Sequence, residues 1–353
     1  PLGSYRVCEH AQSLPALRCK GDPMDRGARR SAIRSCLREA LKSAAYGAFS
    51  SAHLEFFAAR RGTGHVLNLH RVHPDASPFW PPIHPDQLDW LIGRLKHVGS
   101  FVDIKELASI PVPATERIFV LSFDDGYADF LQYALPVIES HGIPSNLNIV
   151  AQPTLTGLPI WSARLYDALS HLEGGDLDVI DRLLPEARNL SRRGSLEHMG
   201  FAISNHVRQL PISERLAVVE KIEEAGRPNL DPVRALTVPE ITALPPSVHV
   251  GAHGGTHESM AHASVSEFEA DFKMCRDLFE NHLGRPLVTY AFPLGGYRTE
   301  HLDFLRASGV EQILLVGEKT TKGGSPVLPR LTIGGRLRGQ FLAKSVGVAI
   351  NAG

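Results

Sequence analysis

The chain has 353 residues, with 37 Lys and Arg against 38 Asp and Glu, which gives a formal net charge of −1. This balance leaves no global field that would collect nucleic acid, so we expect no nucleic-acid partner. The length suffices for two ordinary domains or for one large α/β domain, and we favour one domain with an insertion. No run approaches the roughly 20 apolar residues of a membrane span.

The N-terminal segment of residues 1–23 has little periodicity, and its opening Pro1-Leu2-Gly3-Ser4 resembles the remnant of a cleaved tag. Nothing after Met24 resembles a signal peptide, so we expect a cytoplasmic protein. The scattered cysteines are typical of reduced or buried thiols, although Cys8 and Cys19 could pair.

Residues 24–60 form an N-terminal region with an amphipathic helix predicted over residues 29–50. Arg30, Arg34 and Arg38 share one side of this helix at i,i+4 spacing. The simpler interpretation is a helix packed on the domain with a solvated basic face. The alternative is peripheral contact with an anionic membrane surface.

From residue 61 to residue 350, short apolar runs alternate with helical segments, as βα units do. The predicted strands are Val66–Leu69, Ile118–Phe123, Leu147–Val150, Val248–Gly251, Val288–Phe292, Ile313–Val316 and Leu328–Ile333. Seven such runs favour a barrel over an open sheet. Polar residues follow the first, second and fourth runs, and Pro293-Leu294-Gly295 follows the fifth. The carboxyl ends of parallel barrel strands converge on one mouth.

The stretch between the third and fourth runs, residues 152–246, is far longer than one crossover helix requires. We interpret it as a helical insertion. Helical periodicity is visible over Ile160–Leu172, Leu177–Leu184 and Ile212–Ala225.

Two adjacent carboxylates, Asp124 and Asp125, directly follow a predicted buried strand and precede Gly126. One of the two side chains can ligate a metal while its neighbour, turned away, acts as a base. Alone, the sequence Asp-Asp-Gly also fits a turn or a helix N-cap.

Another strand end is followed by His253 and His257, whose imidazoles can bind one cation from a single turn of chain. Together with Asp125 they would supply three ligands and leave positions open for water and substrate, which is typical of a catalytic metal site. Imidazole and carboxylate ligands suit a divalent first-row ion, and we expect Zn²⁺.

The segment Tyr290–Gly295 spans the end of the fifth strand and the turn after it, which contains Pro293 and Leu294. Proline followed by glycine fixes the backbone and lets a substrate approach, so the Leu294 backbone N–H could stabilise an oxyanion. The alternative is a rigid loop without a chemical role.

These three motifs, in this order, resemble those of the polysaccharide deacetylases, the NodB-homology or carbohydrate esterase family 4 group. The resemblance runs from about His65 to Ile333, and Leu69-His70-Arg71-Val72 is similar to an early motif of exopolysaccharide-type members. It implies a distorted (β/α)7 barrel, Asp124 as the catalytic base, and Asp125, His253 and His257 as metal ligands.

The chain also departs from the family pattern. Gly254 replaces a hydroxyl residue that could brace the histidine loop, and Ala291 replaces the arginine that orients the base, a role for which Arg330 is our candidate. The late Leu-x-x-His motif that supplies a general acid is missing. His70 is our candidate acid, and a histidine bonded within the barrel wall is the alternative.

The expected activity is metal-dependent hydrolysis of an N-acetyl group from an N-acetylated sugar of a glycan or glycan precursor, with release of acetate. Trp80, Tyr127 and Trp161 could stack on sugar rings or serve packing alone. Two alternatives stay open, namely an amidohydrolase acting on a small amide or imide, and a catalytically silent glycan-binding protein.

Overall fold

The structure is a computed structural model that describes residues 61–77, 79, 81–172, 177–184, 196–334 and 338–347, with the backbone alone at 177–179 and 196–198. The N-terminal segment 1–23 and the helix predicted within residues 24–60 lie outside the described residues. Among the cysteines, the structure describes Cys275, which is buried and free.

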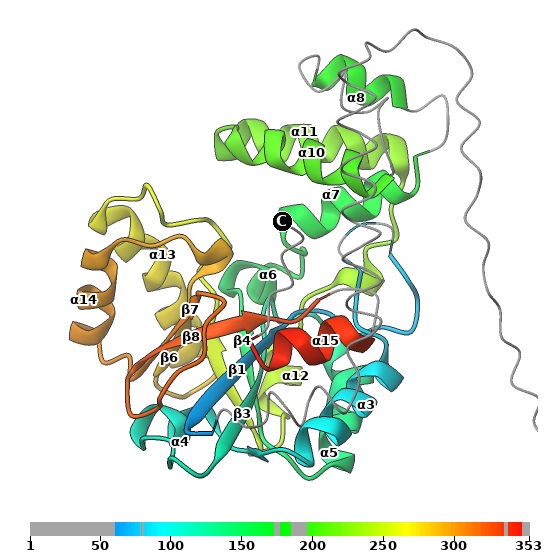
Figure 1. Ribbon diagram of the computed structural model, residues 1–353. Coiled ribbons are helices and arrows are strands. Elements are labelled where there is room, and N and C mark those ends of the chain that lie inside the picture. Colours follow the sequence, from blue (N-terminus) through cyan, green and yellow to red (C-terminus); the bar gives the residue numbers. More distant parts are fainter. Residues whose placement is uncertain are drawn as a thin grey trace, which may run out of the picture.

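Seven parallel strands close a barrel (Figure 1), and they coincide with the seven predicted runs. They are β1 (Thr63–Leu69), β3 (Arg117–Phe123), β4 (Ser145–Ile149), β5 (Val248–Ala252), β6 (Thr289–Ala291), β7 (Gln312–Val316) and β8 (Val327–Thr332). β1 pairs with both β3 and β8, which closes the ring. The predicted distorted (β/α)7 barrel is confirmed.

One short strand, β2 (Ser100–Phe101), was not predicted. It pairs with the beginning of β3 at Ile118 and Phe119, below the point where β4 joins the same strand at Leu121. Two residues are too few to show a strand period in the sequence.

The inward-facing side chains change from apolar to polar along the barrel axis. Val66, Val120 and Leu328 belong to one apolar cluster inside the barrel. Two residues further along their strands stand Asn68, Ser122 and Arg330, which contact one another as the two-residue period of a strand requires. A buried polar layer therefore lies directly beneath the active-site end.

Helices surround the barrel (Figure 1) and bury the outer faces of the strands. They are α3 (Pro85–Lys96), α5 (Leu135–Ser140), α13 (Val265–Asp277), α14 (Thr299–Ala307) and α15 (Arg338–Ser345). α4 (Ile104–Ser109) instead packs its buried residues into the apolar cluster inside the barrel. Single π-helical turns, η1 (Phe130–Ala134) and η4 (Leu278–His282), precede α5 and extend α13.

The connection between β4 and β5 carries α6 (Ala151–Thr156), α7 (Trp161–Ser170), α8 (Leu177–Leu183), α10 (Leu196–Gln209), α11 (Ile212–Gly226), the short η3 (Asp231–Val233) and α12 (Val238–Thr242). α7, α8, α10 and α11 gather beyond one end of the barrel (Figure 1) around an apolar core of their own. α7, α8 and α11 match the predicted helical segments, whereas α10 was not predicted. The limits of the insertion and of the N-terminal regions stay predictions.

None of the described helices combines the length and the apolar character that crossing a bilayer requires.

Candidate metal centre and active site

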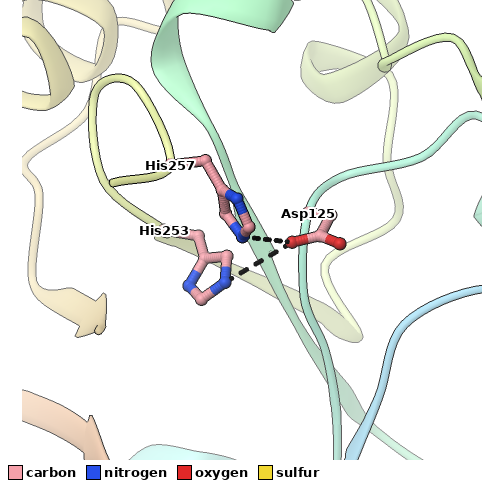
Figure 2. A group of neighbouring side chains, drawn as sticks. All are labelled: Asp125, His253 and His257. Carbon is pink, nitrogen blue, oxygen red and sulfur yellow. Dashed lines mark ion pairs between the residues drawn. The ribbon is translucent and has the colours of Figure 1, made fainter. Parts of the chain in front are cut away.

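The three predicted metal ligands lie together at the carboxyl ends of β3 and β5. Both imidazoles turn toward the Asp125 carboxylate (Figure 2), whose Oδ1 lies 3.1 Å from Nε2 of His257 and 3.5 Å from Nε2 of His253. One ligand atom from each residue falls within 4.8 Å of the others. In a tetrahedral zinc site with bonds of about 2.0–2.1 Å, the ligand atoms lie about 3.4 Å apart, so the spacing fits such an ion.

The orientation of His253 is fixed by a backbone carbonyl. Its Nδ1 lies 3.0 Å from the carbonyl oxygen of Ala291, which can only accept a hydrogen bond. Nδ1 therefore carries the proton, and the lone pair of Nε2 faces Asp125 as a metal ligand requires. Ala291, which stands where many family members have arginine, contributes through its main chain.

Backbone strain is concentrated at the site. Asp125, His257 and Leu294 have φ values of 73°, 61° and 55°, in the left-handed region that L residues seldom adopt. Gly126 continues the turn at φ 68°, where an added Cβ would lie 2.9 Å from the Ile149 side chain. Non-glycine residues persist there only when their surroundings hold them, so this strain marks a functional constraint.

Asp271 of α13 braces the histidine loop. Its carboxylate accepts hydrogen bonds from the backbone N–H of Gly255 at 2.7 Å, and from the N–H and hydroxyl of Thr256 at 3.0 and 2.8 Å. The hydroxyl missing at Gly254 is thus replaced by one two residues later. Gly254 itself has a φ of 77°, and an added Cβ would lie 2.9 Å from the ring of Pro293.

Asp124 is held at one carboxylate oxygen and open at the other. Its Oδ1 accepts hydrogen bonds from Arg330 Nη1 at 2.7 Å and from Asn148 Nδ2 at 2.8 Å. Its Oδ2 lies 3.7 Å from His253 Nε2. The fully buried Arg330 also donates to the side-chain oxygen of Asn68 at 3.1 Å. The structure therefore places Arg330 where the missing motif arginine was expected to act.

The buried charges set the protonation states of the site. Burial raises the pKa of Asp124, but the charge and hydrogen bond of Arg330 and the nearby histidines His253 and His70 together outweigh this and hold the pKa well below its usual range. Burial also raises the pKa of Asp125, but His257, His70 and His253 together lower it to about 2. Burial lowers the pKa of His253 to about 4. At neutral pH, Asp125 is thus ionised and His253 is neutral, which are the forms that bind a cation.

The residues present fit a divalent cation. Oδ1 of Asp125 is buried and has no hydrogen-bond partner within the described part of the chain, although it faces both imidazoles. A buried carboxylate oxygen without a hydrogen bond costs folding free energy unless it binds a cation or a proton. Burial lowers the pKa of His257, but the carboxylates of Asp125, Asp124 and Glu258 together raise it above its ordinary value, so a cation would displace a proton there.

A cavity of about 270 Å³ opens at the candidate metal-binding group of Asp125, His253 and His257. His70 and Leu294, two of the predicted catalytic residues, line it together with Asp124 and this group. His70 lies close enough for its charge to lower the pKa of both aspartates. The predicted residues, far apart in sequence, therefore meet at one mouth.

The opposite side of the cavity was not foreseen. Its lining includes Tyr166 and Asp167 of α7 and Phe201 of α10, for which no local motif gave a signal. Of the aromatic residues considered for sugar stacking, Tyr127 lines the cavity, and Trp161 is buried in the core of the helical connection. Trp80 lies outside the described residues.

The sequence comparison shows which family part of this chain resembles. A family model described as polysaccharide deacetylase matches residues 239–313, which include the histidine motif and the third motif. No protein of curated function matches the sequence.

Solved structures give the fold. The structure of IcaB from Ammonifex degensii is 16% identical, with a TM-score of 0.52, over 80% of this chain and 97% of that chain. A de-N-acetylase from Aggregatibacter actinomycetemcomitans is 15% identical, with a TM-score of 0.48, over 77% and 95% of the two chains. With the motifs in one site, the resemblance to the polysaccharide deacetylases of the NodB-homology type is confirmed.

Proposed function

We propose that this protein removes the acetyl group from an N-acetylated sugar of a glycan or glycan precursor by metal-dependent hydrolysis, with release of acetate. The family model supports hydrolytic deacetylation of a glycan. The single observation that carries the finer proposal is the buried Asp125, His253 and His257 group beside the Asp124–Arg330 pair at the base of an open cavity.

Asp125, His253 and His257 would hold the cation, for which Zn²⁺ suits one carboxylate and two imidazoles. Such a cation, when bound, lowers the pKa of water and polarises a carbonyl oxygen. The Ala291 carbonyl fixes the His253 ring, and Asp271 holds the loop that carries His257. The protein thus presents a preformed ligand set and leaves the opposite side open for a substrate.

Asp124 accepts the proton of the attacking water at Oδ2, because Arg330 and Asn148 occupy Oδ1. The Leu294 N–H donates to the oxygen of the acetamide as negative charge develops on it, and one such donor is typically worth about 3–4 kcal/mol. His70 supplies the proton that the departing sugar amine requires. Asp124 takes this second role if His70 does not.

The decisive experiment is an acetate-release screen over N-acetylated sugars with the purified protein, with and without a chelator. We expect release that the chelator abolishes and that Zn²⁺ or another divalent ion restores. Turnover of cyclic imides without release from any sugar would favour the amidohydrolase alternative. Glycan binding without turnover by the metal-loaded protein would favour the silent binding protein.

A further inference from the structure

The helical connection between β4 and β5 contacts both loops that carry the proposed metal ligands. Near its end, it runs beside the turn that follows β3, where the backbone N–H of Ala128 donates to the carbonyl of Arg234 at 2.9 Å. Its helix α11 reaches the histidine loop through a side chain, since Arg215 donates a hydrogen bond to the carboxylate of Glu258. Glu258 directly follows the metal ligand His257 in the chain. The connection is therefore joined to both halves of the ligand group.

Arg215 is held on several sides within the helical connection. Its side chain is buried, and its Nη2 donates to the carbonyl oxygens of Arg208 and Leu210 at 3.0 and 3.1 Å. Its guanidinium carbon lies over the ring of Trp161, 4.9 Å from the ring centre, a distance at which a cation and an aromatic ring attract each other. Trp161 belongs to the apolar core of the connection. The guanidinium thus has a fixed place from which it can restrain another residue.

The histidine loop is strained next to the residue that Arg215 binds. His257 has a φ of 61°, and a non-glycine residue keeps such a conformation only when its surroundings hold it. Before His257 in the chain, Asp271 accepts hydrogen bonds from the N–H and the hydroxyl of Thr256. After His257, the ion pair of Glu258 with Arg215 restrains the loop. The strained ligand is therefore held from both sides, from α13 and from α11.

We propose that Arg215 is a positioning residue for the metal ligand His257 and acts on it through Glu258. The inference rests on the proposed function and adds to it that the helical connection takes part in forming the metal site. Arg215 lies outside the described lining of the cavity. Its effect therefore reaches the metal site through the histidine loop and not through a contact with the substrate.

Two simpler roles for Arg215 predict different results. If Arg215 acted by its charge alone, its removal would tighten the binding of a cation, because like charges repel. If it only stabilised the helical connection, its loss would have the same effects as the loss of another ion pair there. Arg164 of α7 forms such a pair, since it donates to both carboxylate oxygens of Glu223 on α11 at 2.8 and 2.6 Å.

The test measures the affinity for Zn²⁺ by competition with a chelator, and the free energy of unfolding of the metal-free protein in denaturant. Arg215→Met should weaken Zn²⁺ binding by about tenfold, as the loss of a residue that orients a metal ligand does. At saturating Zn²⁺, kcat should recover to within a few-fold of the wild-type value. Arg164→Met is the matched control, which should also lower the free energy of unfolding but leave the Zn²⁺ affinity unchanged.

Glu258→Asp tests the same link from the other side. It keeps the negative charge beside His257 but is one methylene shorter, which draws the carboxylate away from Arg215. The core of the helical connection stays intact, so this variant gives an answer even where Arg215→Met does not fold. Zn²⁺ affinity should fall by about tenfold, because the anchor is lost while the charge remains.

Three results would overturn the inference. They are unchanged or tighter Zn²⁺ binding by Arg215→Met, equal weakening by Arg164→Met, and unchanged binding by Glu258→Asp. Each of these, with Zn²⁺ binding and acetate release by the wild-type protein, counts against the positioning role alone. A wild-type protein that binds no Zn²⁺ and releases no acetate would count against the proposed function instead.

Discussion

The two walls of the cavity are built in different ways. On the barrel wall, Asp124, His253 and the histidine loop are each held by a buried partner, respectively Arg330, the Ala291 carbonyl and Asp271. On the helical wall, Phe201 is 37% exposed and Asp167 has an oxygen without a hydrogen bond in the described residues. Catalytic groups need a fixed geometry, which buried partners provide. Groups that contact a substrate instead keep exposed surface for it.

The walls also differ in what holds them together. The barrel wall is continuous with the sheet, whereas α7, α10 and α11 have a separate core. Arg71, which follows β1, joins the two by donating to Asp129 at 2.8 Å and to the carbonyl of Pro232 at 2.7 Å. Changes in the barrel wall should therefore alter kcat and metal content, and changes in the helical wall should alter KM.

The largest effect is expected from His253→Ala. Removal of one imidazole leaves two ligands, so the protein should lose both bound metal and turnover, with kcat falling to the limit of detection. Metal analysis together with acetate release checks this. A variant that keeps turnover at normal metal content would exclude His253 as a ligand.

Asp124→Asn should separate the base from the ligands. The amide keeps the size of the side chain but cannot take a proton, so kcat should fall by about a thousandfold, within the usual range for a general base. Metal content should stay normal, because Asp124 is outside the proposed ligand set. Near-normal turnover would remove the base assignment.

Arg330→Lys is expected to lower kcat by about tenfold to a hundredfold with little change in KM. Lysine keeps the charge but lacks the planar fork that reaches Asp124 and Asn68 together. Arg330→Met should in addition lower the free energy of unfolding by about 3–5 kcal/mol, because it leaves Asp124 buried and unpaired. Denaturant unfolding measures this second effect, and equal stability of the two variants would argue against the pair.

Asp271→Asn tests the support of the histidine loop. Loss of the carboxylate weakens hydrogen bonds to Gly255 and Thr256, so metal affinity should fall by about tenfold to a hundredfold. At saturating metal, kcat should recover to within a few-fold of the wild-type value. Glu269→Gln, an exposed carboxylate on the same helix, is the control and should change neither quantity.

The smallest effect is expected on the helical wall. Phe201→Ala removes a partly exposed ring from the cavity lining, which should raise KM by about threefold and leave kcat unchanged, since only part of the apolar area of a phenylalanine is lost. Steady-state kinetics with an oligosaccharide measures it. A fall in kcat with unchanged KM would contradict the division between the two walls.

The strands and the candidate metal-binding group could be predicted from the sequence because each depends on a pattern of a few neighbouring residues. A buried parallel strand begins as a continuous apolar run, as in Ile118–Leu121, and the polar residues after the strand mark the active-site end. The motifs around Asp124, His253 and Pro293 are each short enough to recognise within a few residues. β2 and α10 were missed, and in β2 the two residues are too few for a period to be visible.

Other parts depend on contacts between distant residues. Asn148 and Asp271 sit within ordinary strand and helix sequences, and nothing local indicates that they hold Asp124 and the histidine loop. Arg330 was proposed for its role because Ala291 stands where the family pattern has an arginine. Its contact with Asp124 depends on barrel closure, which brings together residues that are 206 positions apart.

By itself, the sequence determined the barrel class, the strand ends and the residues proposed as metal ligands, because periodicity and short motifs act over a few residues. Only the tertiary structure decided which groups complete the site. Closing the barrel places Arg330 beside Asp124, and packing the β4–β5 connection above its mouth sets α7 across from the metal-binding group. Such contacts span much of the chain, so no local pattern encodes them.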